Sequence, residues 1–205
     1  MDPIKIKKFD TVIFAGSLCK TFRKNLNNFH KKKYLISDKN KDINVHQSCL
    51  FDKKKLKIGI SWKSVISIYG KLKSIELSDF QELFNDDRQI INLQYGDTKE
   101  DIADMAQKGF NIYSYENINL YNDIESCMSI LKNIDVFVTV SNTTAHIAAS
   151  MGVNTFLICP KKSSTYFYWN VEDNNTPWYY NVKIFQVNDT LKKTINKINK
   201  LLEKV

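Results

Sequence analysis

The sequence has 205 residues, 43% of them hydrophobic, and a formal net charge of +8. This composition supports the packed core of one sizeable domain and excludes wholesale disorder. No apolar run approaches the roughly 18 residues that span a bilayer, and the first ten residues lack a signal-peptide core. We therefore expect a cytoplasmic protein without a transmembrane segment, either free or peripheral at the inner membrane.

The basic charge permits a nucleic-acid partner, but the lysines are spread along the whole chain among many Asn and Ile residues. We therefore expect no nucleic-acid binding, since an anionic small ligand would need only two or three of these lysines. The four cysteines have no C-x-x-C spacing, which favours a reduced compartment over a disulfide framework or a zinc site. They are Cys19, Cys49, Cys127 and Cys159.

Residues 1–52 do not follow the pattern of the rest of the chain. Their composition predicts one strand over 9–16, one helix over 17–29, and then a charged, lysine-rich linker. One strand and one helix cannot form an independent core. We therefore expect residues 1–52 to be the remnant of another domain together with its linker.

From residue 53 onward, short β-branched and aromatic runs alternate with segments of helical periodicity. A capping-box spacing predicts a helix that starts near Ser78, and a glycine predicts the end of another helix at Gly109. Further helices are expected over 121–134 and 191–205, each with one apolar face. The six predicted strands are 57–61, 90–96, 111–115, 135–140, 155–159 and 182–187.

Alternating strands and helices joined by short loops predict a parallel sheet covered on both faces. We expect a Rossmann-like, doubly wound α/β domain over residues 53–205. With the common strand order 3-2-1-4-5-6, a ligand crevice opens at the carboxyl ends of the first and fourth strands. The first strand leads into Ser61–Ser64 and the fourth into Ser141–His146. These two polar loops are therefore expected to face each other across the crevice.

The loop after the fourth strand places five polar residues where a helix is predicted to begin, near Thr143. A helix N-terminus exposes unpaired N–H groups and attracts phosphate, and the hydroxyls of Thr143 and Thr144 add donors beside Ser141. His146 would reach a phosphate or a ribose hydroxyl. The alternative is that Asn142 merely caps the helix and that His146 is a satisfied core histidine. We favour ligand binding because so many polar groups gather at one turn.

Lysines near the end of the first strand suit a diphosphate, and Gly70 allows a turn between them. For any one lysine, a solvated surface loop is the alternative. Gln94, at the end of the second strand, is expected near a base or a ribose. The seven aromatic residues between 166 and 180 favour packing, or contact with a partner domain, over stacking on a ligand. Besides the five residues of the fourth-strand loop, the candidate site contains Trp62, Lys63, Ser64, Lys71, Lys73 and Gln94.

Several motifs that would indicate other chemistry are absent from the sequence. Without G-x-G-x-x-G a dinucleotide oxidoreductase is disfavoured, and neither a Walker A sequence nor G-x-S-x-G occurs. There is no D-x-D pair and no cluster of His, Cys and Asp with metal-site spacing. We therefore expect neither a metal nor a cofactor at the site.

The motifs KLKIGISWKS, INLQYGD, LKNIDVFVTVSNTTAHIAASMG, YWNVED and PWYYNVKIFQ occur in the order and spacing of one family. Over residues 9–200, and most specifically over 135–180, the sequence resembles the donor-binding C-terminal half of GT-B-fold glycosyltransferases. The similarity is to the heptosyltransferase-like family 9 and to the type linked to tetratricopeptide repeats. Many members of these families carry Asp where Asn142 stands, so no role that needs a carboxylate is implied there. The resemblance implies that the turn Asn142–Thr144 cradles the diphosphate of a nucleotide sugar, that Gln94, Lys71 and Lys73 lie near the nucleotide, and that His146 matches the histidine of the following helix.

The resemblance also implies metal-independent transfer of a sugar from a nucleotide-diphospho-sugar to an acceptor, with the hexosyl, heptosyl or N-acetylhexosaminyl class left open. A GT-B enzyme has two Rossmann-like halves. Here we expect a truncated N-terminal half, reduced to residues 1–52, and no general base. The alternatives are a non-catalytic binding or assembly module, or half of a split enzyme that needs a partner chain or a homo-oligomer. An epimerase of the same fold would need two halves and catalytic carboxylates.

Overall fold

The computed structural model describes residues 10–40, 52, 54–65, 70–160, 166–169 and 175–205. Its contacts divide the chain into two units, Met1–Lys31 and Lys32–Val205, which are described separately. The second unit includes a short strap at its start, because the backbone N–H groups of Tyr34 and Leu35 donate to the carbonyl of Ser150 at 2.7 and 3.2 Å. The domain boundary predicted between residues 52 and 53 stays a prediction.

The first unit contains short helical turns without buried residues. A 3-10 turn, η2 (Ala15–Ser17), leads into helix α1 (Leu18–Phe22), and a further 3-10 turn, η3, spans Leu26–Asn28. The strand predicted over 9–16 is wrong, since residues 11–14 have no regular structure and Ala15 begins a turn; residue 9 lies outside the described residues. A strand forms only against a partner. The helix predicted over 17–29 forms only as α1 and η3, because no buried face stabilises a longer one.

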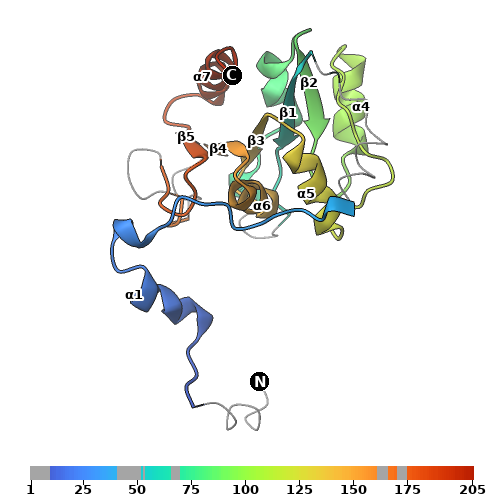
Figure 1. The fold of residues 1–205 in the computed structure, drawn as a ribbon. Coiled ribbons are helices and arrows are strands. Elements are labelled where there is room, and N and C mark those ends of the chain that lie inside the picture. Colours follow the sequence, from blue (N-terminus) through green and yellow to red (C-terminus); the bar gives the residue numbers. More distant parts are fainter. Residues whose placement is uncertain (1–9, 41–51, 53, 66–69, 161–165, 170–174) are drawn as a thin grey trace. The chain divides into compact units, whose positions relative to one another are not determined.

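The second unit is built on a sheet of five parallel strands in the order β2-β1-β3-β4-β5. Figure 1 shows them side by side in this order. Each strand coincides closely with a predicted one, and β2 ends four residues earlier than expected. The strands are β1 (Leu56–Ser61), β2 (Arg88–Asn92), β3 (Val136–Val140), β4 (Asn154–Cys159) and β5 (Val182–Gln186).

The predicted strand over 111–115 is wrong. This segment makes a single parallel bridge between Tyr113 and Ile91 of β2, with Tyr113 N–H donating to the carbonyl of Ile90. No residue of the segment is buried, so side-chain packing does not extend the pairing into a strand. The bridge nevertheless lies beside β2. This is the position that the order 3-2-1-4-5-6 gives to the third predicted strand, which was residues 111–115.

Helices follow most of the strands. The capping box predicted from Ser78 to Gln81 is wrong: the segment is a 3-10 helix that begins at Leu77, and the N–H of Glu76 donates to the Asp79 carboxylate at 2.9 Å. The remaining predicted helices form, and the one near residue 143 begins at Thr143. The helical elements are α3 (Gly70–Lys73), η4 (Leu77–Leu83), α4 (Lys99–Gln107), α5 (Ile124–Lys132), α6 (Thr143–Met151) and α7 (Leu191–Leu202).

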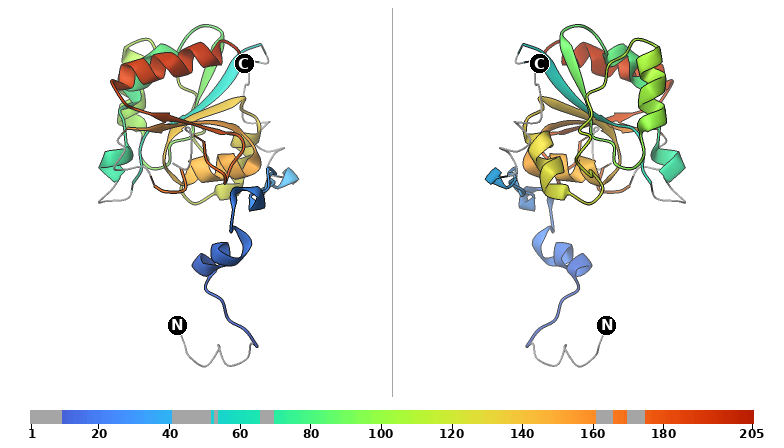
Figure 2. Two further views of the ribbon diagram at one scale, coloured as in Figure 1. Left: turned by 90° about the vertical axis from the view of Figure 1, so that its left-hand side faces the viewer. Right: turned by 90° about the vertical axis from the view of Figure 1, so that its right-hand side faces the viewer.

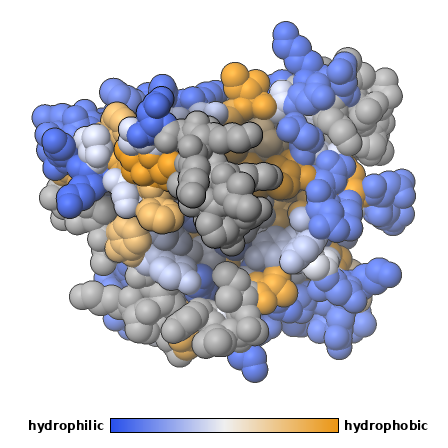
Figure 3. Space-filling model, turned by 90° about the horizontal axis from the view of Figure 1, so that it is seen from below, coloured by the Kyte–Doolittle hydropathy of each residue, from blue (hydrophilic) through white to orange (hydrophobic). Residues whose placement is uncertain are grey.

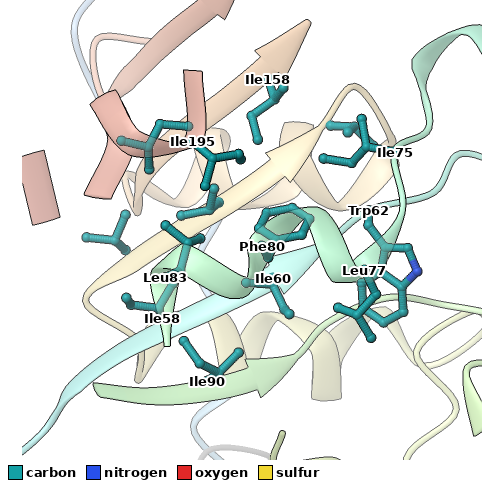
Figure 4. Close-up of a cluster of buried hydrophobic side chains, with 14 of the residues drawn as sticks. Ile58, Ile60, Trp62, Ile75, Leu77, Phe80, Leu83, Ile90, Ile158 and Ile195 are labelled. Atoms are coloured by element: carbon teal, nitrogen blue, oxygen red, sulfur yellow. The ribbon is translucent and has the colours of Figure 1, made fainter. Parts of the chain in front are cut away.

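Both faces of the sheet are covered. Ile58 and Ile60 of β1 point into a core shared with η4, α4 and α7, which Figure 4 shows in part. Phe137 of β3 and Ile91 of β2 point the other way, against α5 and α6. The views in Figure 2 show α7 (red) and α6 (orange) on opposite sides of the sheet. The predicted Rossmann-like, doubly wound α/β fold is therefore confirmed.

The carboxyl ends of β1 and β3 are neighbours. Ser61 is in register with Thr139, so the chain leaves β1 towards Trp62 and leaves β3 towards Ser141 at adjacent points of one sheet edge. The two loops that the strand order predicted to meet do lie side by side.

Candidate functional site

The turn between β3 and α6 is capped by Asn142. Its Oδ1 accepts a hydrogen bond from the Ala145 N–H at 3.0 Å, and the helix ends at Gly152, whose φ of 80° suits a glycine. Thr143 is exposed, whereas the side chain of Thr144 is buried. The N–H groups of these two threonines have no intrahelical acceptor, because they lie in the first turn. They remain suited to an anion.

A buried chain of hydrogen bonds joins the loops after β1, β2 and β3. Asn142 Nδ2 donates to Ser61 Oγ at 2.7 Å and to the carbonyl of Lys63 at 3.4 Å. Ser61 Oγ donates in turn to Gln94 Oε1 at 2.9 Å, which also accepts the N–H groups of Trp62 (2.9 Å) and Lys63 (2.7 Å). The side chains of Gln94 and Asn142 therefore organise the loops around the candidate site.

The other residues of the first-strand loop are held by protein groups. The Trp62 indole is fully buried in the core drawn in Figure 4, and its Nε1 donates to Asp101 Oδ2 at 3.0 Å. The same oxygen accepts the Lys63 ammonium at 2.6 Å. Ser64 N–H donates to Ser74 Oγ at 3.0 Å. The charge of Lys63 is thus already compensated by the first turn of α4.

The two lysines of α3 differ in environment. Lys71 is exposed, whereas Lys73 is only 3% exposed and its ammonium lies 4.2 Å from the centre of the Tyr166 ring. Within the described residues, no carboxylate forms an ion pair with Lys73. A buried ammonium without a counterion is costly unless a ligand or another group compensates it.

His146 is packed among aromatic side chains. Its ring stacks on Trp169 at 4.4 Å between centroids, and Nδ1 lies 3.0 Å from the hydroxyl of Tyr179. Burial, and secondly the charge of Lys73, lower the pKa of His146 to about 4, so the ring is neutral near pH 7. Trp169 is itself fully buried, and its Nε1 donates to Ser141 Oγ at 3.0 Å. This part of the aromatic loop packs against α6 and the end of β3.

A cavity of about 520 Å³ lies beside the first turn of α6, between this helix, α5 and the loops after β1 and β2. Of the predicted site residues, Thr143 and Thr144 line it. Sequence reasoning missed its aromatic and aliphatic walls, although one of them, Tyr95, directly follows the predicted Gln94. A larger hollow of about 1070 Å³ lies beside α4 and includes Gln94. Other lining residues of the smaller cavity are Val65, Tyr95, Tyr121 and Ile124.

Within the described part of the chain, no three His, Cys, Asp or Glu side chains are grouped so that they could hold a metal ion. Among the same residues, no helix has the length and apolar character needed to cross a membrane.

The parallel α/β fold matches the Rossmann-like fold found in solved glycosyltransferase structures. The structure is similar to Escherichia coli ADP-heptose LPS heptosyltransferase II, with a TM-score of 0.58, 10% identity, and coverage of 90% of this chain and 59% of that one. It is also similar to the glycosyl transferase family 9 protein of Veillonella parvula, with a TM-score of 0.58, 9% identity, and coverage of 84% and 54%. At these low identities, the similarities concern the fold alone.

In sequence, the chain is similar to Protein FlbA of Caulobacter vibrioides, with 28% identity over 132 residues. The match covers 63% of this chain and 22% of FlbA. The chain thus spans about a fifth of that relative, and less than two thirds of either heptosyltransferase-like structure. No family model matches the sequence.

Proposed function

We propose that the second unit is the donor-binding domain of a glycosyltransferase and binds a nucleotide-diphospho-sugar. The observation that carries the proposal is the cavity that Thr143 and Thr144 help to line, beside the edge of the sheet where β1 and β3 end as neighbours. Ligands of doubly wound sheets bind at this edge. The fold shared with glycosyltransferases supports the same assignment.

The diphosphate would lie at the N-terminus of α6. The first-turn N–H groups and the hydroxyl of Thr143 would donate to it, and the helix dipole would stabilise its growing charge as the sugar departs. Lys73 of α3 acts on the same region, since its charge contributes to lowering the pKa of His146 in the first turn of α6. Its ammonium has no ion-pair partner among the described residues, and it would add a second positive charge. This arrangement needs neither a metal nor a cofactor beyond the donor. The sugar, the base and the acceptor stay open.

Calorimetric titration with UDP, ADP and GDP tests this proposal. We expect one nucleotide to bind the wild-type protein and to bind about tenfold more weakly to Thr143→Ala/Thr144→Ala and to Lys73→Met, since each change removes donors or charge. Lys197→Met, on the exposed face of α7, is the charge-matched control and should leave affinity unchanged. Equal affinity in the wild type and in both site variants would reject the site.

A second candidate function is a binding or assembly module, or half of a split enzyme. Apolar side chains are exposed at the mouth of the cavity: Val65 by 60%, Tyr121 by 65% and Ile124 by 51%. Figure 3 shows one face of the molecule, on which apolar patches alternate with hydrophilic ones. Such exposed residues often mark an interface. Light scattering, which gives the oligomeric state, together with a sugar-transfer assay distinguishes the two functions. A monomer that transfers sugar without a partner would rule out the binding module and the split enzyme.

A further inference from the structure

The side chain of Asn142 uses both ends of its amide. Oδ1 accepts the Ala145 N–H, while Nδ2 donates to Ser61 Oγ and to the Lys63 carbonyl. The Ala145 N–H can only donate, so the orientation of the amide is determined by the backbone. An Asp at this position would cap α6 equally well but could not donate.

The direction of the remaining hydrogen bonds is determined in the same way. The backbone N–H groups of Trp62 and Lys63 both point at one atom of Gln94, which must therefore be its oxygen. Because Ser61 Oγ donates its single hydrogen to that oxygen, it can only accept from residue 142. The chain from Asn142 through Ser61 to Gln94 is polarised, buried and uncharged.

We propose that Asn142 is a positioning residue of the donor site and that Asn142, Ser61 and Gln94 form an amide lock. The lock holds the loop after β1 against the first turn of α6, and so sets the position of this turn, whose residues Thr143 and Thr144 line the cavity. This role rests on the proposed function, whereas the lock itself can be tested without a ligand. It requires an amide at residue 142, since the Lys63 carbonyl has no hydrogen and the single hydrogen of Ser61 Oγ is already donated to Gln94.

The variant Asn142→Asp isolates this requirement. Its carboxylate would retain the cap on Ala145 N–H but would face Ser61 Oγ and the Lys63 carbonyl, which repel it unless it takes up a proton. Among the described residues, the ionisable side chains near these loops include Lys63 with its partner Asp101, together with Lys73 and His146. They are unchanged in the variant, so a comparison with the wild type at each pH isolates residue 142.

Urea unfolding without ligand tests the lock. Asn142→Asp should lose stability at about pH 8 and recover most of it at about pH 5, where a protonated carboxyl again donates. Ser61→Ala should relieve part of the loss in the double variant. The control is Asn188→Asp, which adds the same charge at an exposed position. A pH profile for Asn142→Asp that matches the control would overturn the lock.

Calorimetry then tests positioning, with whichever of UDP, ADP and GDP binds the wild type. The ratio of variant to wild-type dissociation constants should be about ten at pH 8 and fall towards one at pH 5. A ratio of one at both values, despite lost stability, would show that residue 142 is only structural and overturn its positioning role. If none of the three binds the wild type, the proposed function and the positioning role fail together, while the unfolding data still decide the lock.

Discussion

The polar residues at the carboxyl edge of the sheet differ in whether their side chains are already bonded to protein groups. The side-chain oxygen of Gln94 and both ends of the Asn142 amide bond to protein groups, and Lys63 is paired with Asp101. Thr143 and Thr144 line the cavity, and Lys73 is buried without a carboxylate among the described residues. The groups with unused capacity for an anion are therefore a small subset of the predicted site.

His146 provides a pH-dependent prediction at this scale. Its pKa in the folded protein is about 4, below the usual 6.5, so the folded state favours the neutral ring. As the pH falls from 6.5 to 4, His146 becomes protonated in the unfolded chain but stays neutral in the folded one. The free energy of unfolding should therefore fall by on the order of 3 kcal/mol. Above 6.5 this contribution is fully present, and below 4 it is gone.

The measurement is an NMR titration of His146, together with urea unfolding of the wild type and of His146→Gln across this pH range. The difference in unfolding free energy between the two proteins should shrink as the pH falls from 6.5 to 4, whereas carboxylates common to both cancel. A His146 midpoint near 6.5 would contradict the packing of the ring against Trp169.

At the scale of elements, the loop between β1 and α3 depends on a close approach of backbone to backbone. A Cβ at Gly70 would lie 2.2 Å from the carbonyl oxygen of Ser64. We expect Gly70→Ala to destabilise the protein by about 1–3 kcal/mol, because neither backbone segment can give way cheaply. Gly16→Ala is the control, since no atom lies within 4 Å of the added Cβ. Equal urea midpoints for the two variants would show that the loop tolerates a side chain.

Helix α7 is held by its apolar face. Ile198 is fully buried in the core shared with β1 and η4, while the adjacent Lys197 is exposed. Ile198→Ala should lower the free energy of unfolding by about 2–5 kcal/mol through lost burial and a cavity. Lys197→Ala should change it by less than about 0.5 kcal/mol. Chemical denaturation followed by circular dichroism measures both, and a small effect of Ile198→Ala would mean that α7 is not part of the cooperative core.

Strands and helices could be predicted from the sequence where their local hydrophobic pattern matched the residues that become buried in the folded protein. All five strands have apolar residues on core-facing positions, and α7 shows its periodicity directly in the sequence. Residues 10–16 and 111–115 have the same β-prone composition but gain no buried face, so they form no strand. Composition alone cannot distinguish the two cases, because strand stability comes from partners.

At the scale of the whole molecule, the apolar clusters formed by the described residues lie after residue 55, and the strap adds contacts from residues 34–38. Asp38 N–H donates to Glu125 Oε2 at 3.1 Å, and Tyr34 and Leu35 bond to Ser150. We expect a chain that begins at Lys32 to unfold with the same urea midpoint as the full chain. A chain that begins at residue 53 should be less stable, since it loses the strap.

Equal stability of both shortened chains would instead favour the boundary predicted between residues 52 and 53. A loss of cooperative unfolding in the chain that begins at Lys32 would show that the second unit does not fold alone.

The sequence by itself determined the class of fold, five of the six predicted strands and the start of α6, because alternating hydrophobic periods and a capping residue are local signals. The expectation that Ser61–Ser64 and Ser141–His146 meet came from the strand order common to such sheets, and β1 and β3 do end side by side. Only the tertiary structure decided which polar groups satisfy one another. Ser61, Gln94 and Asn142 are 33 to 81 positions apart along the chain. Whether two such groups form a hydrogen bond depends on differences of a few tenths of an ångström in the distance between them, which no sequence pattern encodes.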